Sequence, residues 1–404
     1  MTSIQVSDFG PDLLRAAEAQ RGATTELRRE IHRDPELGLD LPNTQARVLD
    51  ALTGLDLAIT TGTTSTSIVA DLDTGRPGST VLLRGDMDAL PMTEDVESSF
   101  RSAHEGRSHS CGHDAHTAML VSAAAILSER RSELSGRVRF MFQPGEEGFH
   151  GAKHMIAEGV LDGVDRAFAI HVVTNAPSGI VLTRGGALLA SSDGFEITVT
   201  GRGGHASSPH HCLDPIPTAA SIVTGLQTMV SRQIDPSQSA VVTVANITAG
   251  STGNVIPETA YMQGTIRAVS EEVRADLHAA IERVADGTAA AHACSCETTI
   301  KPGYSVTLND PVHAQLTTKV AGALFGSDQS AVMPATAMGA EDFSYVLNEV
   351  PGAMAFLGAC PDGIDPAVAA PNHSNHMQLN EAALERGTAL YAAMALVRPE
   401  EPRE

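Results

Sequence analysis

A nine-residue segment of this chain, residues 109–117, contains three histidines, one cysteine and one aspartate. Cys111 and His113 are two residues apart, so in an extended or turn backbone both side chains can point to the same side, and Gly112 permits a tight bend between them. Thiolate and imidazole are preferred ligands of zinc and related divalent ions. A polar helix N-terminus capped by Asp114 is the alternative, but capping does not explain a cysteine flanked by histidines. The segment therefore predicts a metal site.

Two adjacent carboxylates, Glu146 and Glu147, follow the apolar segment Val138 to Phe142. Neighbouring carboxylates repel each other unless a cation separates their roles. A metal ion that binds one of them leaves the other free to take a proton from water, as a general base does. An exposed acidic turn is the commoner meaning of a lone Glu-Glu pair, but the position after a strand and the presence of the first segment favour the metal interpretation.

Two further histidines stand in suitable settings. His171 lies in the apolar strand expected over Ala167 to Val172, and His373 lies in a polar loop. Alone, each would more often be an ordinary hydrogen-bonded histidine. Together with Cys111, His113 and Glu147 they make five ligands, enough for two ions that share one bridging group.

The elements around these residues predict an α/β fold. Helical and strand patterns alternate in the first half of the chain, as in a layer built on a mainly parallel sheet. The candidate residues fall repeatedly after apolar strands, and open α/β sheets bind their ligands at the carboxyl ends of strands. The expected helices are Pro11 to His32, Thr117 to Arg131, Pro311 to Phe325, Glu341 to Val350 and Glu381 to Val397.

The pattern changes near Gly185. From Phe195 to Lys301 the expected order of elements is βαββαβ, the split-βαβ arrangement of a small ferredoxin-like domain. The sequence therefore predicts a catalytic domain in two parts, residues 1–184 and 303–404, with a ferredoxin-like α+β domain inserted at residues 185–302.

Composition excludes some partners. The chain has 404 residues, 42% of them hydrophobic, with 27 basic and 49 acidic residues and a net charge of −22. That balance argues against nucleic acid or an anionic membrane as a partner.

The segment Met1 to Gly10 has no basic region followed by an apolar stretch, and five scattered cysteines suit reduced thiols. We expect a cytoplasmic protein. Cys294 and Cys296, at an expected helix end, are interpreted as structural.

Six motifs in order, from about His32 to His373, resemble the M20 metallopeptidase clan in its aminoacylase, hippurate hydrolase and auxin-conjugate hydrolase branch. They are residues 84–91 (RGDMDALP), 111–117 (CGHDAHT), 143–148 (QPGEEG), 201–210 (GRGGHASSPH), 254–257 (NVIP) and 339–344 (GAEDFS).

The resemblance implies Cys111 as bridging ligand, His113 and His171 on one ion, Glu147 and His373 on the other, and Glu146 as the base. It also implies that the inserted domain is a lid and dimerisation domain. In that domain His205 would stabilise the oxyanion, often in the active site of the other subunit, and Asn254 and Arg267 would help to hold the substrate carboxylate. Arg84, Asp86 and Asp88 are expected to support and orient the ligands.

Two departures from the family pattern matter. The last motif usually reads His-Ser-Pro-x-Phe, but here it is His373-Ser374-Asn375-His376-Met377, which leaves open whether His373 or His376 is the ligand. The run after the glutamates is commonly rich in glycine, whereas Phe149 and His150 follow Gly148 here, a change that could reshape the acyl pocket.

The expected reaction is hydrolysis of the amide bond of an N-acyl amino acid or similar small conjugate by an amidohydrolase with two divalent ions (Zn²⁺, Mn²⁺, Ni²⁺ or Co²⁺). We expect the enzyme to form a homodimer through the lid. A dipeptidase or a biosynthetic N-acetyl-amino-acid deacetylase of the same clan is the alternative. A non-catalytic metal-binding scaffold is a third, which the intact Glu146 disfavours. No Gly-x-Ser-x-Gly elbow with a histidine partner points to a serine amidase.

Overall fold

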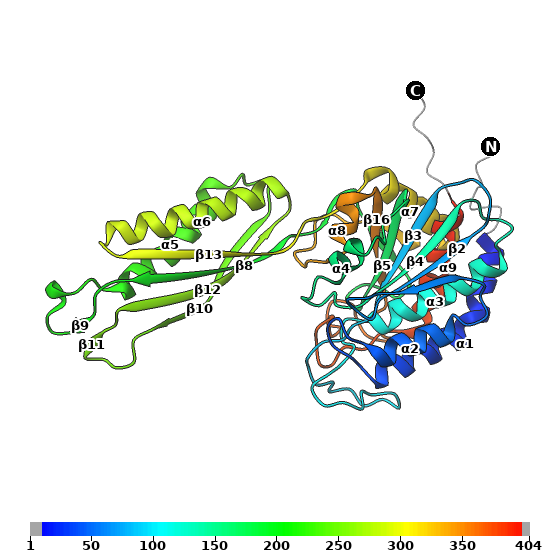
Figure 1. Cartoon of the computed structure of the whole chain (residues 1–404), viewed down its shortest axis with the longest axis horizontal. Coiled ribbons are helices and arrows are strands. Elements are labelled where there is room, and N and C mark those ends of the chain that lie inside the picture. Colours follow the sequence, from blue (N-terminus) through cyan, green and yellow to red (C-terminus); the bar gives the residue numbers. More distant parts are fainter. Residues whose placement is uncertain (1–9, 398–404) are drawn as a thin grey trace, which may run out of the picture. The chain divides into compact units, whose positions relative to one another are not determined.

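The computed structural model describes residues 10–397. The segment Met1 to Gly10, apart from Gly10, therefore lies outside the described residues. The chain divides into two compact units. The first comprises Met1–Leu188, Leu308–Ala335 and Asp342–Glu404, and the second comprises Leu189–Thr307 and Thr336–Glu341 (Figure 1).

The first unit is built on an eight-stranded sheet with the order β1-β2-β4-β3-β5-β16-β6-β15. Its central pairings, β4 with β3, β3 with β5 and β5 with β16, are parallel, whereas β1, β2 and β6 pair antiparallel with β2, β4 and β16. The sheet is thus mixed at its flanks and parallel where the candidate residues lie. The strands are β1 (Ala58–Thr61), β2 (Ile68–Asp73), β3 (Thr80–Asp86), β4 (Arg137–Gln143), β5 (Arg166–Val173), β6 (Val181–Thr183), β15 (Ser330–Val332) and β16 (Gly352–Gly358).

Helices cover this sheet with apolar faces. In α1, Leu13, Ala17, Leu27 and Ile31 are buried, and their spacing in multiples of about one turn places them on one side of the helix. Helix α1 packs on α3 and α9, and α7 contacts α9 and β16. The helices of this unit are α1 (Gly10–Arg33), α2 (Pro42–Ala51), α3 (His113–Glu129), α4 (Gly151–Ala157), α7 (Pro311–Phe325), α8 (Ser344–Glu349) and α9 (Leu384–Leu396).

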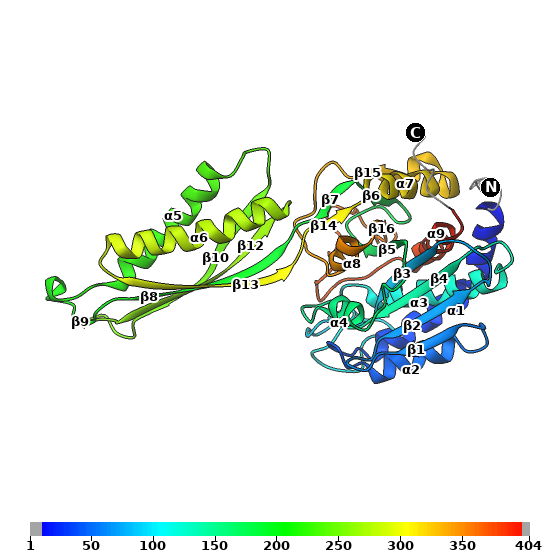
Figure 2. The ribbon, with the colours of Figure 1, turned by 45° about the horizontal axis from the view of Figure 1, so that its top comes forward.

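The second unit has a four-stranded antiparallel sheet with the order β10-β12-β8-β13. Its elements follow one another as β8 (Ser192–Thr200), α5 (Pro215–Gln233), β10 (Ala240–Ala249), β12 (Thr259–Ala268), α6 (Glu271–Ala291) and β13 (Ser295–Tyr304). Helices α5 and α6 lie on the same face of the sheet (Figure 2), and their apolar sides form a separate core with Phe195, Ile197 and Val199 of β8. A small ribbon, β9 (Gly204–His205) with β11 (Val255–Ile256), lies at one end of this sheet.

Two local expectations were wrong. The helix expected over Glu341 to Val350 begins only at Ser344, because the Asp342 carboxylate is buried against Arg84 and Gln143 instead of facing solvent on a helix. Cys296 lies in β13 and not at a helix end, since α6 stops at Ala291.

Short strands β7 (Gly186–Leu189) and β14 (Thr307–Asn309) occur near the points where the chain passes between the units. Among residues 10–397, no helix is long and apolar enough to cross a membrane.

Candidate metal centre

The candidate residues of the first unit gather where parallel strands end. Asp86 is the last residue of β3 and pairs with Gln143, the last residue of β4. Strand β5, which carries His171, runs parallel to β3 on its other side. Because parallel strands present their carboxyl ends at one edge, the loops that follow β3 and β4 meet the end of β5 there.

Five side chains at this edge supply two overlapping groups of donor atoms. Cys111, His113 and His171 form one group, and Cys111, Glu147 and His373 form the other, with the donor atoms of each group within 4.8 Å of one another. We call these five residues the ligand cluster. Cys111 belongs to both groups, so its thiolate has the position of a shared ligand. Its Sγ lies 3.4 Å from Nε2 of His171.

Gly112 determines how Cys111 and His113 meet. Its φ is +92°, a conformation that disfavours a side chain, and a Cβ there would lie 2.4 Å from Cγ2 of Val172. Helix α3 begins at the next residue. The tight bend expected from the sequence is therefore present, and it places the thiol and the imidazole on either side of the start of a buried helix.

The donors suit a divalent ion. Both ring nitrogens of His113 are buried without a hydrogen bond to any described residue, and the nearest carboxylate oxygens, on Asp86 and Asp88, are 3.5 Å away. Buried polar atoms normally have a partner, so this imidazole is unsatisfied by the protein alone. Thiolate, imidazole and carboxylate ligands together fit zinc and neighbouring transition metals.

Hydrogen bonds orient the other imidazoles. Nδ1 of His171 donates to the carbonyl of Val172 at 2.8 Å, which leaves Nε2 toward Cys111. Burial lowers the pKa of His171 well below its usual range, so the ring is neutral, as a metal ligand must be. His116 is different: Nδ1 contacts Asp86 at 2.5 Å and Nε2 accepts from the Val172 amide at 2.8 Å. Both nitrogens of His116 are thus engaged by the protein.

A buried ion-pair network supports the cluster. Arg84 is fully buried and donates to Asp86, Asp342 and Gln143 at 2.7–3.0 Å. Burial alone would raise the pKa of Asp86, but Arg84, His113 and His116 together outweigh burial and hold that pKa well below its usual range. The sequence suggested Arg84 and Asp86 as supports. It gave no role to Asp342, whose motif was noted only through the family resemblance.

Asp88 fixes the two glutamates. Its carboxylate oxygens accept the backbone N–H groups of Glu146 and Glu147 at 2.9 and 3.0 Å. The Glu147 side chain contacts Nε2 of His373 at 3.1 Å. Glu146, also buried, lies outside the two groups that share Cys111, but it forms one further donor group with His113 and Glu147 and another with Glu341 and Asp342. The adjacent carboxylates therefore have different surroundings.

The last histidine motif places its two rings apart. His373 has a φ of +67°, an uncommon conformation for a residue with a side chain and a frequent mark of functional sites. Hydrogen bonds with Cys111 and Glu147 raise its pKa to about 10, so its surroundings favour a cation at this position, and a metal ion would replace the proton there. Nδ1 of His376 instead lies 3.2 Å from the carbonyl of Asp95, and His376 is in none of the donor groups found among residues 10–397.

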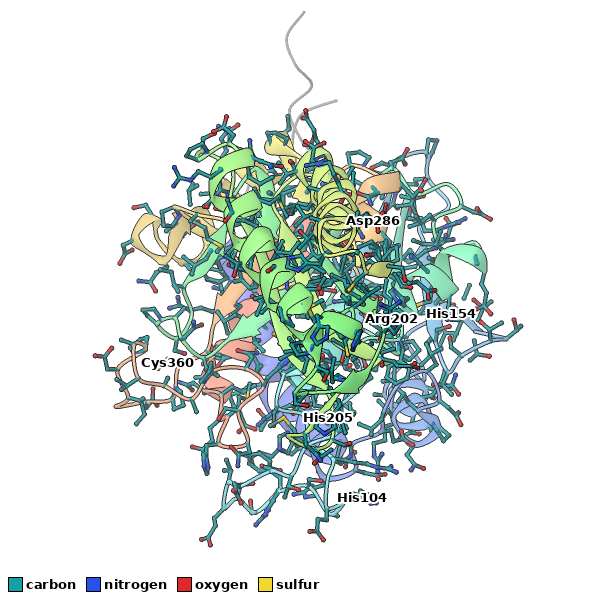
Figure 3. The ribbon with its side chains drawn as sticks, turned by 90° about the vertical axis from the view of Figure 1, so that its left-hand side faces the viewer. His104, His154, Arg202, His205, Asp286 and Cys360 are labelled. Carbon is teal, nitrogen blue, oxygen red and sulfur yellow. The ribbon has the colours of Figure 1, made fainter. Side chains whose placement is uncertain are left out.

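The three candidate residues of the second unit do not lie together within it. His205 pairs with Val255, beside Asn254, on the exposed β9–β11 ribbon, and Figure 3 shows His205 and Arg202 on the surface of this unit. Arg267 lies near the far end of β12, roughly 26 Å along the strand from Thr259 at about 3.3 Å per residue. Its half-buried guanidinium makes no hydrogen bond or ion pair with described residues, and burial lowers its pKa.

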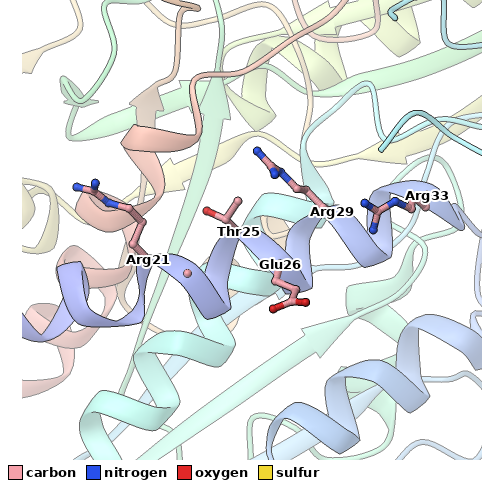
Figure 4. Close-up of a pocket in the computed structure, with 6 residues that line it drawn as sticks. Arg21, Thr25, Glu26, Arg29 and Arg33 are labelled. Atoms are coloured by element: carbon pink, nitrogen blue, oxygen red, sulfur yellow. The ribbon is translucent and has the colours of Figure 1, made fainter. Parts of the chain in front are cut away.

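A separate cavity of about 440 Å³ lies along α1 and shares no residue with the ligand cluster (Figure 4). Two of the arginines that line it are engaged, since Arg21 pairs with Glu385 and Arg29 pairs with Glu381. It is lined by Arg21, Gly22, Thr25, Glu26, Arg29 and Arg33.

Comparison with known proteins agrees with this geometry. Residues 82–397 match the family described as Peptidase family M20/M25/M40. The chain is 37% identical over 375 residues to thermostable carboxypeptidase 2 of Saccharolobus solfataricus, covering 92% of this chain and 94% of that protein. It is 39% identical over 373 residues to the IAA-amino acid hydrolase ILR1-like 4 of Arabidopsis thaliana, covering 91% and 84%. The crystal structure of Bacillus subtilis YXEP, a dinuclear metal binding peptidase from the M20 family, superposes with a TM-score of 0.82 at 31% identity, covering 94% of this chain and 98% of that one.

The chain belongs to the M20/M25/M40 peptidase family. It is a metal-dependent amidohydrolase, as the family and the relatives within it indicate.

Proposed function

We propose that this amidohydrolase cleaves the amide bond of N-acyl amino acids or similar small conjugates, R-CO-NH-CH(R′)-COO⁻. The observation that supports this most directly is the pair of donor groups around Cys111, with a second buried carboxylate, Glu146, beside them. The IAA-amino acid hydrolase relative acts on a conjugate of this class by its name. Ligands and base then lie at the edge where α/β enzymes bind their substrates.

In this proposal two divalent ions would share Cys111 as a ligand; His113 and His171 would hold one ion, and Glu147 and His373 would hold the other. Zn²⁺, Mn²⁺, Ni²⁺ and Co²⁺ all suit such ligands. Bound divalent ions supply Lewis acidity, which favours deprotonation of water and polarises a carbonyl. Asp88 orients Glu147 through the hydrogen bond from its backbone N–H, and Arg84 holds the Asp86 carboxylate beside His113.

Glu146 acts as general base and then as general acid. It takes the proton of the attacking water and delivers it to the amide nitrogen as the C–N bond breaks, so its carboxylate is regenerated in each turnover. This role needs a carboxylate held near the ligands without being one of them. The hydrogen bond from its backbone to Asp88 limits the positions that it can take.

His205 stabilises the oxyanion of the tetrahedral intermediate, and Asn254 and Arg267 bind the substrate carboxylate. His205 and Arg267 lie at opposite ends of β12 in the second unit, so one small substrate cannot contact both from a single copy of that unit. This separation supports a homodimer in which the second unit is a lid and dimerisation domain that supplies His205 to the partner's site.

A peptidase is the second candidate, favoured by the name of the carboxypeptidase relative. If the enzyme is a dipeptidase, its substrate differs from an N-acyl amino acid in bearing a free amino group on the acyl half. We further propose that the enzyme is cytoplasmic. The five free cysteines support this, because disulfides are rare in that compartment.

The experiment combines metal analysis with a substrate screen. We expect up to two divalent ions per chain, loss of activity with a chelator, and hydrolysis of at least one of N-acetyl, N-benzoyl and long-chain N-acyl amino acids. Faster cleavage of unmodified dipeptides than of any acylated amino acid would favour the peptidase. The absence of metal-dependent hydrolysis of either class would contradict the proposal.

A further inference from the structure

An aromatic side chain follows the two glutamates and is half exposed. Phe149 has 50% of its surface accessible, although large apolar side chains near a buried site are normally covered. We propose that Phe149 forms an apolar wall of the acyl-binding site and makes the enzyme prefer aromatic or long apolar acyl groups to acetyl. This inference rests on the proposed function and adds the substrate class.

The position of Phe149 is tied to the catalytic pair. The Gly148 amide donates to the carbonyl of Glu146 at 2.7 Å, which closes a tight turn over the two glutamates. The Asp88 carboxylate accepts hydrogen bonds from the backbone N–H groups of both Glu146 and Glu147. The backbone that carries the aromatic ring is therefore fixed within a few residues of the base.

Two glycines make room for the ring on its inner side. A Cβ at Gly38 would lie 3.2 Å from the Phe149 ring, and a Cβ at Gly145 would lie 3.1 Å from Cβ of Phe149 and 2.6 Å from Leu39. The loop that contains Gly38 is anchored beside the site, because the carbonyl of Glu36 accepts a hydrogen bond from the backbone N–H of Ala89, the residue after Asp88, at 2.8 Å. The ring thus rests on a fitted surface and presents its other side to solvent.

The residue after the ring is also held. His150 adopts a φ of +57°, an unfavourable conformation for a residue with a Cβ. Its Nδ1 lies 2.9 Å from the hydroxyl of Tyr345, and Nζ of Lys153 lies 4.2 Å from the centroid of the same tyrosine ring. The contact with Tyr345 holds the His150 ring one residue beyond Phe149.

The chemistry of this wall matches one half of the substrate. Phe149 carries no charge, and burial lowers the pKa of His150, so that ring is neutral near pH 7. The Phe149 ring itself offers no partner to a carboxylate, whereas an apolar acyl group that covers the exposed ring removes apolar area from water. The acyl half is therefore the part of the substrate that the wall selects.

The test compares wild type, Phe149→Ala, Phe149→Leu and the control Ile59→Ala, which removes an exposed apolar side chain at the edge strand β1. One series varies the acyl group on glycine (acetyl, hexanoyl, phenylacetyl, benzoyl), and a second varies the amino acid with acetyl constant. We expect Phe149→Ala to lower the ratio of kcat/KM for benzoyl over acetyl by about 10-fold or more, the usual scale for an apolar specificity contact. Phe149→Leu should restore part of the ratio, and Ile59→Ala should leave it unchanged, with metal content equal in all four proteins.

An unchanged acyl ratio in Phe149→Ala, with active wild type, would overturn the role of Phe149 and leave the proposed function standing. A change confined to the amino-acid series would place the ring against the leaving group and likewise overturn the acyl assignment. If wild type hydrolyses none of these compounds, the proposed function fails, and this inference fails with it.

Discussion

At the scale of single residues, Cys111 is distinctive because it belongs to both donor groups of the site. A thiolate that bridges two ions cannot be replaced by a hydroxyl, which is harder and rarely ionised. We therefore expect Cys111→Ser to lose bound metal, measured by elemental analysis after dialysis, with a change in Tm of only a few degrees relative to the metal-free wild type.

The matched control is Cys360→Ser. Cys360 is also a buried free thiol, but its Sγ contacts the carbonyl of Ile364, and it belongs to no donor group of the described residues. It should retain full metal content. Equal metal content in the two variants would argue against Cys111 as a ligand.

The candidate site was visible in the sequence where its residues are consecutive, as in Cys111-Gly112-His113, because short spacing alone brings such side chains together. Contacts between distant segments were not visible. Arg84 and Asp342 are 258 residues apart, and nothing in either local pattern encodes their ion pair. The engagement of both His116 nitrogens likewise depends on the neighbouring strand β5.

At the scale of elements, apolar runs predicted the buried strands well because burial on both faces requires them. Strand β16 is buried along its whole length, as its apolar sequence suggests. The flanks of the sheet were less predictable, since β1 is exposed and β6 pairs antiparallel with β16. Strand direction at a sheet edge depends on where the chain returns, which local sequence does not specify.

A buried ion pair joins three elements of the second unit. Asp193 of β8 accepts hydrogen bonds from Arg274 and His278 of α6 at 2.6–2.9 Å and from the Gly303 amide of β13 at 2.8 Å. Asp193→Ala leaves these donors without their acceptor, so we expect a loss of about 3 kcal/mol in the free energy of unfolding at pH 7. Denaturant unfolding measures this, with the exposed Asp276→Ala on α6 as control.

The same contact predicts a pH dependence. Burial alone would raise the pKa of Asp193, but its bonds with Arg274, Gly303 and His278 lower it. The stabilisation is therefore present above the unfolded-state pKa of about 3.9 and is lost as the pH falls through the lower folded-state value. Asp193→Asn should show a weaker loss of stability below pH 4 than wild type, and an identical acid dependence would contradict the argument.

At the scale of the whole molecule, the proposed dimer can be tested by mixing inactive variants. Glu146→Gln lacks the base and His205→Ala lacks the oxyanion donor, so each homodimer should be nearly inactive. If His205 acts in the partner's site, each mixed dimer contains one complete site, and random exchange of equal amounts should restore about a quarter of wild-type activity.

No recovery after verified subunit exchange would show that His205 does not act across subunits. If light scattering shows that the fully active enzyme is a monomer, the proposed dimer itself is contradicted.

The central claim is that the adjacent glutamates divide their work, Glu146 as base and Glu147 as ligand. The most direct measurement compares the metal content and turnover of two full-length variants prepared in parallel, Glu146→Gln and Glu147→Gln. We predict that Glu146→Gln keeps its metal and binds substrate while kcat falls by ~10²–10⁴, and that Glu147→Gln loses metal first. Metal loss in Glu146→Gln with metal retained in Glu147→Gln would reverse the roles, and near-normal turnover with full metal in both would contradict the mechanism.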